Sequence, residues 1–125
     1  PIAMTAGLTM LEELSEPGFY DALNQKVQML CEGLQAKADQ AGIPFTTNNI
    51  GGMFGLFFTD LKKVSDFQQA TQCDIKRFQK FFHGMLNEGI YLAPSAYEAG
   101  FVSSAHGDNE INTTIDSAAK VFASL

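Results

Sequence analysis

The stretch FTTNNIGGMFGLFF (residues 45–58) decides the fold of this chain. Residues 45–50 predict a β-strand, and residues 53–58 form an apolar run with almost no polar alternation. Such a run is typical of a strand that is covered on both faces. Gly51 and Gly52 separate the two runs and predict a turn or a close approach of the backbone. We therefore expect a β-hairpin over residues 45–58.

Two helices are predicted before the hairpin. Residues 1–14 place Met4, Leu8 and Leu11 at helical spacing, and the turn residues 15–18 end that segment. The second helix is amphipathic, with polar side chains on one face and Gly42 as its C-terminal stop. Its apolar stripe consists of Leu23, Val27, Leu30, Leu34, Ala38 and Ala41.

More helices and two short strands are predicted after the hairpin. Residues 66–72 indicate a short helix, and Asp74 is suited to cap a stronger one that ends at Gly89. Residues 90–92 and 101–103 are predicted strands, and residues 93–100 form a loop between them. The last helix begins near Asp108. The apolar stripes of the two longer helices are Ile75, Phe78, Phe82 and Met85, then Ile111, Ile115, Ala118, Phe122 and Leu125.

This order of elements predicts an α+β fold, a small and mainly antiparallel sheet of three or four strands with helices packed on it. The chain has 125 residues, of which 46% are hydrophobic and 11 are phenylalanine, enough for one domain over residues 1–125. It starts at Pro1 inside a helical pattern without a preceding cap, which indicates a segment cut from a longer chain.

The net charge and the composition limit the classes of partner that the chain is expected to bind. The net charge of −6 argues against nucleic acid and against an anionic membrane surface, because both favour a basic face. No apolar run approaches the length of about 20 residues that a membrane span needs. Cys31 and Cys73 lie far apart, without a histidine at metal-ligand spacing, so we expect reduced thiols and no metal site. The cytoplasm is the expected compartment, or the plastid stroma in a plant or alga.

The loop at residues 93–100 is the best candidate for a site, because the common catalytic motifs are missing. Glu98 is the one carboxylate in an otherwise apolar stretch, between Tyr97 and Phe101. Partial desolvation there would raise its pKa and suit proton transfer. The alternative is a solvent-exposed glutamate at a loop tip, which composition alone favours. His106, just before the last helix, is suited to stabilising the turn or to touching a ligand.

A longer pattern adds to this interpretation. The run GIYLAPSAYEAGFVSSAH, residues 89–106, closely resembles the C-terminal signature of the glutamate-1-semialdehyde 2,1-aminomutases. Residues 53–58 resemble the strand of that family's small domain, and residues 78–88 fit the helix that leads into the signature. Residues 1–7 resemble the stretch that follows the family's Gly-Asn pair. The resemblance spans essentially the whole chain but only the C-terminal part of a family member.

The resemblance implies the small C-terminal domain of a fold-type-I pyridoxal-phosphate enzyme, close to the class III aminotransferases. The whole enzyme of that family converts glutamate 1-semialdehyde to 5-aminolevulinate for tetrapyrrole (porphyrin) biosynthesis. Its cofactor cycles between pyridoxamine 5'-phosphate and pyridoxal 5'-phosphate and supplies the electron sink. The family implies a homodimer, with a small-molecule substrate bound near the subunit interface.

The resemblance also assigns roles to residues. Glu98 matches a family glutamate near the cofactor, where it would act as an auxiliary catalytic group, and Ser95 and Tyr97 would shape the substrate pocket. The lysine that bonds to the cofactor belongs to the large domain, so no cofactor-binding residue is expected in this segment. We expect residues 1–14 to link to that large domain, and the segment alone to be inactive and free of cofactor.

Two other interpretations remain open. A class III (omega-amino) aminotransferase would move an amino group between two substrates instead of within one. A non-catalytic interaction module would use the apolar strands and the first helix, which is rich in small residues, as a surface for a partner.

Overall fold

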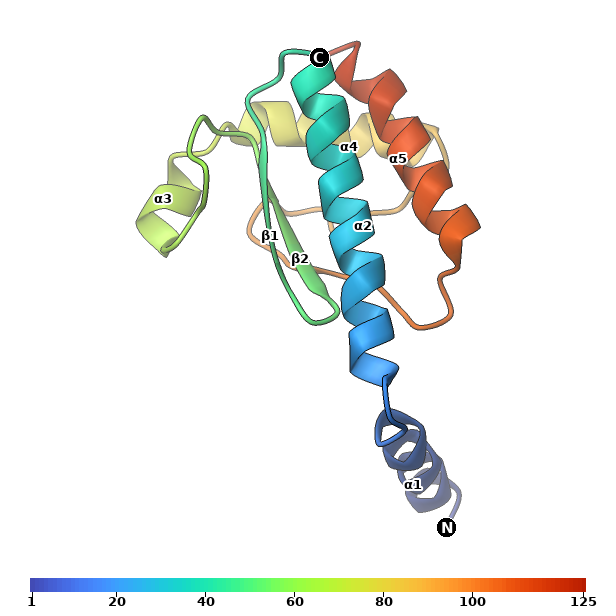
Figure 1. The fold of residues 1–125 in the computed structure, drawn as a ribbon. Helices are drawn as coiled ribbons and strands as arrows, with labels where there is room; N and C mark the ends of the chain where they lie inside the picture. Colours follow the sequence, from blue (N-terminus) through green and yellow to red (C-terminus); the bar gives the residue numbers. More distant parts are fainter.

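The computed structural model describes all 125 residues and contains five helices and one three-stranded sheet. The predicted α+β class is confirmed. The helices are α1 (Ile2–Leu14), α2 (Phe19–Gln40), α3 (Phe67–Thr71), α4 (Ile75–Asn87) and α5 (Asp108–Phe122), and the strands are β1 (Thr46–Ile50), β2 (Met53–Phe57) and β3 (Gly100–Phe101). Helix α2 lies between the hairpin and α5 and packs against both, and α4 crosses behind α2 (Figure 1).

The predicted hairpin is present, and its register gives the sheet two unlike faces. Strands β1 and β2 are antiparallel, with Ile50 opposite Met53, and Gly51 turns the chain at a φ of +53°. Residues opposite each other point to the same face of the sheet. Phe54 and Leu56 are buried under the helices. The other face, here called the open face, holds Ile50, Met53, Phe57 and Phe101.

The prediction that β2 is covered on both faces is wrong for this chain. Met53 is 41% exposed and Ile50, its partner, 76% exposed, so the open face has no cover at that end. On the open face, residues 62–64 cover only the N-terminal end of β1. Thr46 donates its hydroxyl to the Lys62 carbonyl, and Asn48 donates its amide to the Val64 carbonyl. The apolar residues of the open face therefore remain accessible.

The predicted strand at residues 90–92 is also wrong, and the one at residues 101–103 shrinks to β3. The N–H of Ile90 donates to the Met85 carbonyl at 2.9 Å and so ends α4, with Gly89 at a φ of +84°. The backbone of residues 90–92 consequently enters no ladder. Strand β3 pairs with β2 through Phe101 opposite Met53, which gives the order β1-β2-β3.

An aromatic cluster joins the sheet to α4 and α5. The rings of Phe81 and Phe122 stack at 4.8 Å, and Phe45 meets Phe122 edge-on at 5.2 Å. Phe58 belongs to the same group, and the centroid of its ring lies 5.2 Å from that of Phe45. Phe81 is completely buried, although it is not part of the stripe predicted for α4. The remaining stripe residues are buried largely as predicted, in particular Val27, Leu30, Leu34, Ala38, Phe78, Met85, Ile111, Ala118 and Phe122.

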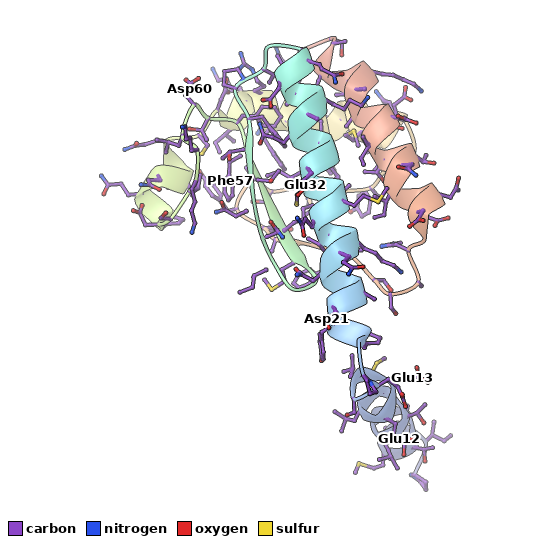
Figure 2. The ribbon with its side chains drawn as sticks, in the orientation of Figure 1. Glu12, Glu13, Asp21, Glu32, Phe57 and Asp60 are labelled. Atoms are coloured by element: carbon purple, nitrogen blue, oxygen red, sulfur yellow. The ribbon has the colours of Figure 1, made fainter.

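Helix α1 lies apart from the rest of the molecule. It extends away from α2 in Figure 1, and none of its residues is buried. The predicted stripe is present but faces solvent, with Met4 79% and Leu11 64% exposed. Figure 2 shows Glu12 and Glu13 near its C-terminal end. No helix of the chain combines the length and the apolar character that crossing a bilayer requires.

Candidate functional site

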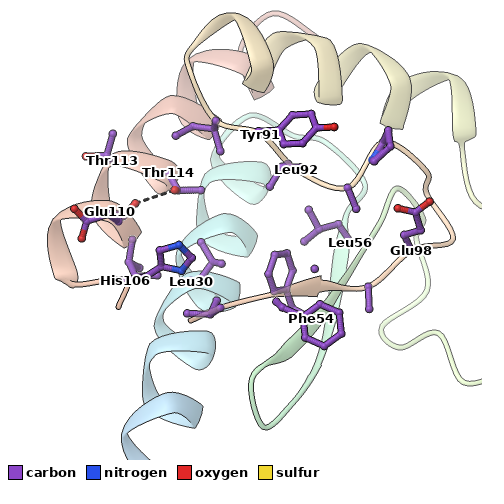
Figure 3. Close-up of a pocket in the computed structure, with 18 of the residues that line it drawn as sticks. Leu30, Phe54, Leu56, Tyr91, Leu92, Glu98, His106, Glu110, Thr113 and Thr114 are labelled. Atoms are coloured by element: carbon purple, nitrogen blue, oxygen red, sulfur yellow. Dashed lines mark hydrogen bonds between the residues drawn. The ribbon is translucent and has the colours of Figure 1, made fainter. Parts of the chain in front are cut away.

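Two cavities flank the loop before β3. The first has a volume of about 600 Å³ and opens between β2, the loop after α4 and the start of α5 (Figure 3). Its floor is apolar and includes Leu30, Phe54 and Leu56. The second, of about 510 Å³, lies on the open face between the hairpin, α3 and the same loop. Phe54, Glu98 and Ala99 line both cavities, so the loop forms the wall between them.

A tight turn brings the three predicted site residues together. The N–H of Glu98 donates to the Ser95 carbonyl at 3.1 Å, and the N–H of Tyr97 donates to Ser95 Oγ at 3.2 Å. Ser95 lines the first cavity, Tyr97 the second and Glu98 both. Glu98 is exposed, so the structure has the solvent-accessible glutamate and not the partly desolvated one. The exposure agrees with the alternative that composition favours, and the role of this loop as a functional site stays a prediction.

Sequence reasoning missed an aromatic pair at the second cavity. The rings of Phe67 and Tyr97 are 6.0 Å apart, and both are largely exposed, at 73% and 53%. Phe67 directly follows Asp66, whose carboxylate accepts the N–H of Gln69 and caps α3. The signal in the sequence was Phe67 at the first position of a predicted short helix. Such a helix has no apolar stripe, so an aromatic side chain on it points to the surface rather than to the core.

His106 lies at the other end of the first cavity. Its Nδ1 accepts a hydrogen bond from the Ser103 N–H at 3.1 Å, so the proton of the neutral ring sits on Nε2. The Ala105 N–H donates to Ser103 Oγ at 3.1 Å and tightens the same turn. Figure 3 shows the imidazole and Glu98 on opposite sides of the cavity. His106 therefore stabilises its turn, which is one of the two roles expected for it, and it also lines the cavity. Its contact with a ligand stays a prediction.

Helix α5 begins as predicted, with Gly107 as its N-cap. Glu110 Oε2 accepts the Gly107 N–H at 2.8 Å. That hydrogen bond lowers the pKa of Glu110, because it stabilises the charged carboxylate. Glycine has no side chain to return the contact, so only half of a capping box forms. The Glu110 carboxylate, which lines the first cavity, is therefore already engaged by the backbone.

Metal binding and disulfide formation find no support in the side chains. No group of three or more histidine, cysteine, aspartate and glutamate side chains is arranged to hold a metal ion. Cys31 and Cys73 are both free thiols. Burial raises the pKa of each, which keeps them protonated and unreactive at neutral pH.

The residues present do not by themselves fit pyridoxal phosphate. That cofactor needs a lysine amine for its covalent bond and donors for its phosphate. The residues that line the two cavities include no lysine and no arginine. Lys26 instead donates to the Ser104 carbonyl, and Lys120 pairs with Glu88 at 2.6 Å. Any cofactor near this loop would have to be held by residues outside these 125.

No family model matches the chain. Among solved structures, it is similar to an omega-transaminase from Sphaerobacter thermophilus, with a TM-score of 0.78 and 23% identity over 98% of this chain and 27% of that one. The internal-aldimine form of the FumI protein from Sphingopyxis sp. MTA144, with pyridoxal phosphate, gives a TM-score of 0.77 and 20% identity over 97% and 26%.

A β-phenylalanine aminotransferase from Variovorax paradoxus gives a TM-score of 0.69 and 22% identity over 79% of this chain and 22% of that one. The chain thus spans about a quarter of the length of the solved chains that it matches. At these identities the comparison establishes the fold. These 125 residues have a fold that forms one part of larger transaminase chains.

Proposed function

We propose that this chain is the C-terminal small domain of a pyridoxal-phosphate enzyme with the class III aminotransferase fold. The observation that carries the proposal is the match of almost the whole chain to about a quarter of an omega-transaminase, at a TM-score of 0.78. The resemblance of residues 89–106 to the aminomutase signature points to the same group of enzymes independently of the fold.

The proposal explains two exposed apolar surfaces. Helix α1 and the open face of the sheet are both uncovered, with Ile2 87% and Phe101 67% exposed. Surfaces of this kind mark places where another part of a protein packs. In the proposed enzyme they contact the large domain of the same chain, which also supplies the lysine that holds the cofactor. A homodimer of that enzyme places the loop at residues 93–99 beside the substrate pocket.

Within this group, we propose that the enzyme moves an amino group within one substrate and converts glutamate 1-semialdehyde to 5-aminolevulinate. The support is the long run at residues 89–106, which is far more specific than a short motif. The turn of Ser95, Tyr97 and Glu98 lies within that run and forms the wall between the two cavities. Pyridoxal phosphate supplies the electron sink for such a transfer when it is bound.

A second candidate is amino transfer between two substrates, as in an omega-transaminase. The solved structures favour it, because two of those described above are named as an omega-transaminase and a β-phenylalanine aminotransferase. The two activities differ in one requirement. An aminomutase needs no external amino acceptor, whereas a transaminase makes no net product without one.

The test uses the full-length protein that contains this sequence, loaded with pyridoxamine phosphate. Glutamate 1-semialdehyde is supplied alone, and 5-aminolevulinate is measured with and without an added 2-oxo acid. Formation of 5-aminolevulinate without the acceptor supports the aminomutase. In a parallel assay that supplies an omega-amine instead, turnover only when the 2-oxo acid is present supports the transaminase. Absence of both activities in a folded protein that binds no cofactor contradicts the proposal and favours an interaction module.

A further inference from the structure

Hydrogen bonds fix the loop at residues 93–99 only from its downstream end. Residues 91–94, on the upstream side, make no hydrogen bond, and those of the turn at Ser95 stay within the loop. Downstream, strand β3 pairs with β2 over only two residues, with Gly100 opposite Phe54. The position of the loop relative to the sheet therefore depends on how β3 meets β2 at this pair.

The Phe54 ring fills the space that a side chain at position 100 would need. A Cβ at Gly100 would lie 2.6 Å from both Cε atoms of the ring and still closer to its Cζ. Gly100 has no positive φ, so its backbone suits other residues and only the contact with the ring requires glycine. Phe54 itself is buried. An aromatic ring that covers a glycine on the neighbouring strand stabilises the pairing of the two strands.

The same ring takes part in the wall between the two cavities. Phe54 lines both, together with Glu98 and Ala99, which directly precede Gly100 in the chain. A side chain at position 100 would push the ring into a cavity or β3 away from β2. Either change would displace Glu98 and the turn at Ser95. In an active site, a misplacement of about 1 Å can lower a rate about 100-fold.

We propose that Gly100 and Phe54 are positioning residues, whose contact holds the loop at residues 93–99 where the amino transfer requires it. They act through the loop, because neither carries a group that can transfer a proton or bind a charged substrate. The inference rests on the proposed function, since it requires the loop to face the substrate of the complete enzyme. It adds to that function the contact on which the geometry of the loop depends.

The test measures kcat and KM of the full-length holoenzyme, with whichever of the two assays above detects activity. Gly100→Ala introduces the conflicting Cβ, and we expect kcat to fall by about tenfold to 100-fold. KM should change much less, because a misplaced loop affects the reacting geometry more than the binding of substrate. The double variant Phe54→Leu/Gly100→Ala shortens the opposing side chain and makes room for that Cβ. It should recover most of the lost kcat.

The control is Gly84→Ala on α4, where a Cβ would lie 2.6 Å from Val121 Cγ1. The steric conflict is similar, but both residues lie outside the two cavities. Urea unfolding measures the loss of stability in each variant. At a temperature where both variants are folded, Gly84→Ala should keep the wild-type kcat.

An unchanged kcat in folded Gly100→Ala, an equal loss in Gly84→Ala, or a double variant no more active than Gly100→Ala overturns the inference and leaves the proposed function intact. If Gly100→Ala does not fold, the double variant decides. A kcat higher than that of Phe54→Leu alone supports the inference, and an equal or lower kcat overturns it. A wild type that binds no pyridoxal phosphate and transfers no amine overturns both the inference and the proposed function.

Discussion

Lys26 on α2 donates a hydrogen bond from Nζ to the carbonyl oxygen of Ser104 at 2.7 Å, across 78 residues of sequence. The contact ties the long helix to the turn that holds His106 and starts α5. The substitution Lys26→Met keeps most of the aliphatic stem and removes the donor. We expect it to lower the free energy of unfolding by about 1 kcal/mol, measured by urea denaturation.

The matched control is Lys37→Met on the same helix, because the Lys37 side chain makes no hydrogen bond within the chain. Its effect should stay within about 0.5 kcal/mol. Equal losses of stability in the two variants would show that the Ser104 contact contributes nothing.

The aromatic cluster should be the most sensitive part of the core. Phe81 is completely buried and stacks on Phe122 at 4.8 Å. Truncation to Phe81→Ala leaves a cavity between α4 and α5, and we expect a loss of about 3–5 kcal/mol. Tyr20→Ala, at a ring that is 57% exposed, should cost less than 1 kcal/mol. The comparison requires only thermal or urea unfolding, and similar costs for both would contradict the assigned core.

The contact between α2 and α5 depends on the absence of a side chain at Gly33. A Cβ there would lie 2.8 Å from Ile115 Cγ1 and still closer to its Cδ1. We expect Gly33→Ala to destabilise the protein by about 1–3 kcal/mol. The second substitution Ile115→Val removes Cδ1 and should recover part of that loss.

Gly7→Ala is the matched control for a helical glycine, because nothing lies within 4 Å of a Cβ at Gly7 in α1. Alanine is the better helix former, so this variant should gain about 0.5–1 kcal/mol. A loss at Gly7 in the full-length protein would show instead that another part of the chain packs closely there.

The start of α5 should be sensitive to acid. The hydrogen bond from the Gly107 N–H lowers the pKa of Glu110 in the folded state. The resulting stabilisation is present at neutral pH and is lost as the pH falls through the lowered folded-state pKa. Glu110→Gln keeps an acceptor but removes the titrating group. Urea unfolding at neutral and acidic pH should show a smaller acid-induced loss in Glu110→Gln than in the wild type, and an identical loss would contradict the assignment.

Most of the secondary structure can be predicted from the sequence, because the hydrophobic periodicity agrees with the positions of the helix caps and turn glycines. The stripe of α2 is buried from Val27 to Ala38, and the caps at Asp74 and Gly107 start α4 and α5 at the expected positions. The glycine pair at residues 51–52 places the hairpin turn. In each case a local signal and a hydrophobic pattern favour the same element.

The sequence was not sufficient for segments whose conformation or surroundings depend on contacts between residues far apart in the chain. The predicted strand at residues 90–92 has suitable side chains, but the Ile90 N–H closes the end of α4 instead of joining a ladder. The exposure of Glu98 and its position between two cavities depend on the turn to Ser95 and on the distant residue Phe54. No periodicity encodes such a position, and the pairing of Phe67 with Tyr97 was missed for the same reason.

The most direct test of the account is to find where the cofactor attaches. The full-length protein is loaded with pyridoxal phosphate, the bond to lysine is reduced with borohydride, and the labelled peptide is identified by mass spectrometry. We expect stoichiometric labelling of one lysine outside these 125 residues. Labelling of any lysine in this sequence, such as Lys26 or Lys120, or no specific labelling of the folded protein, would contradict it.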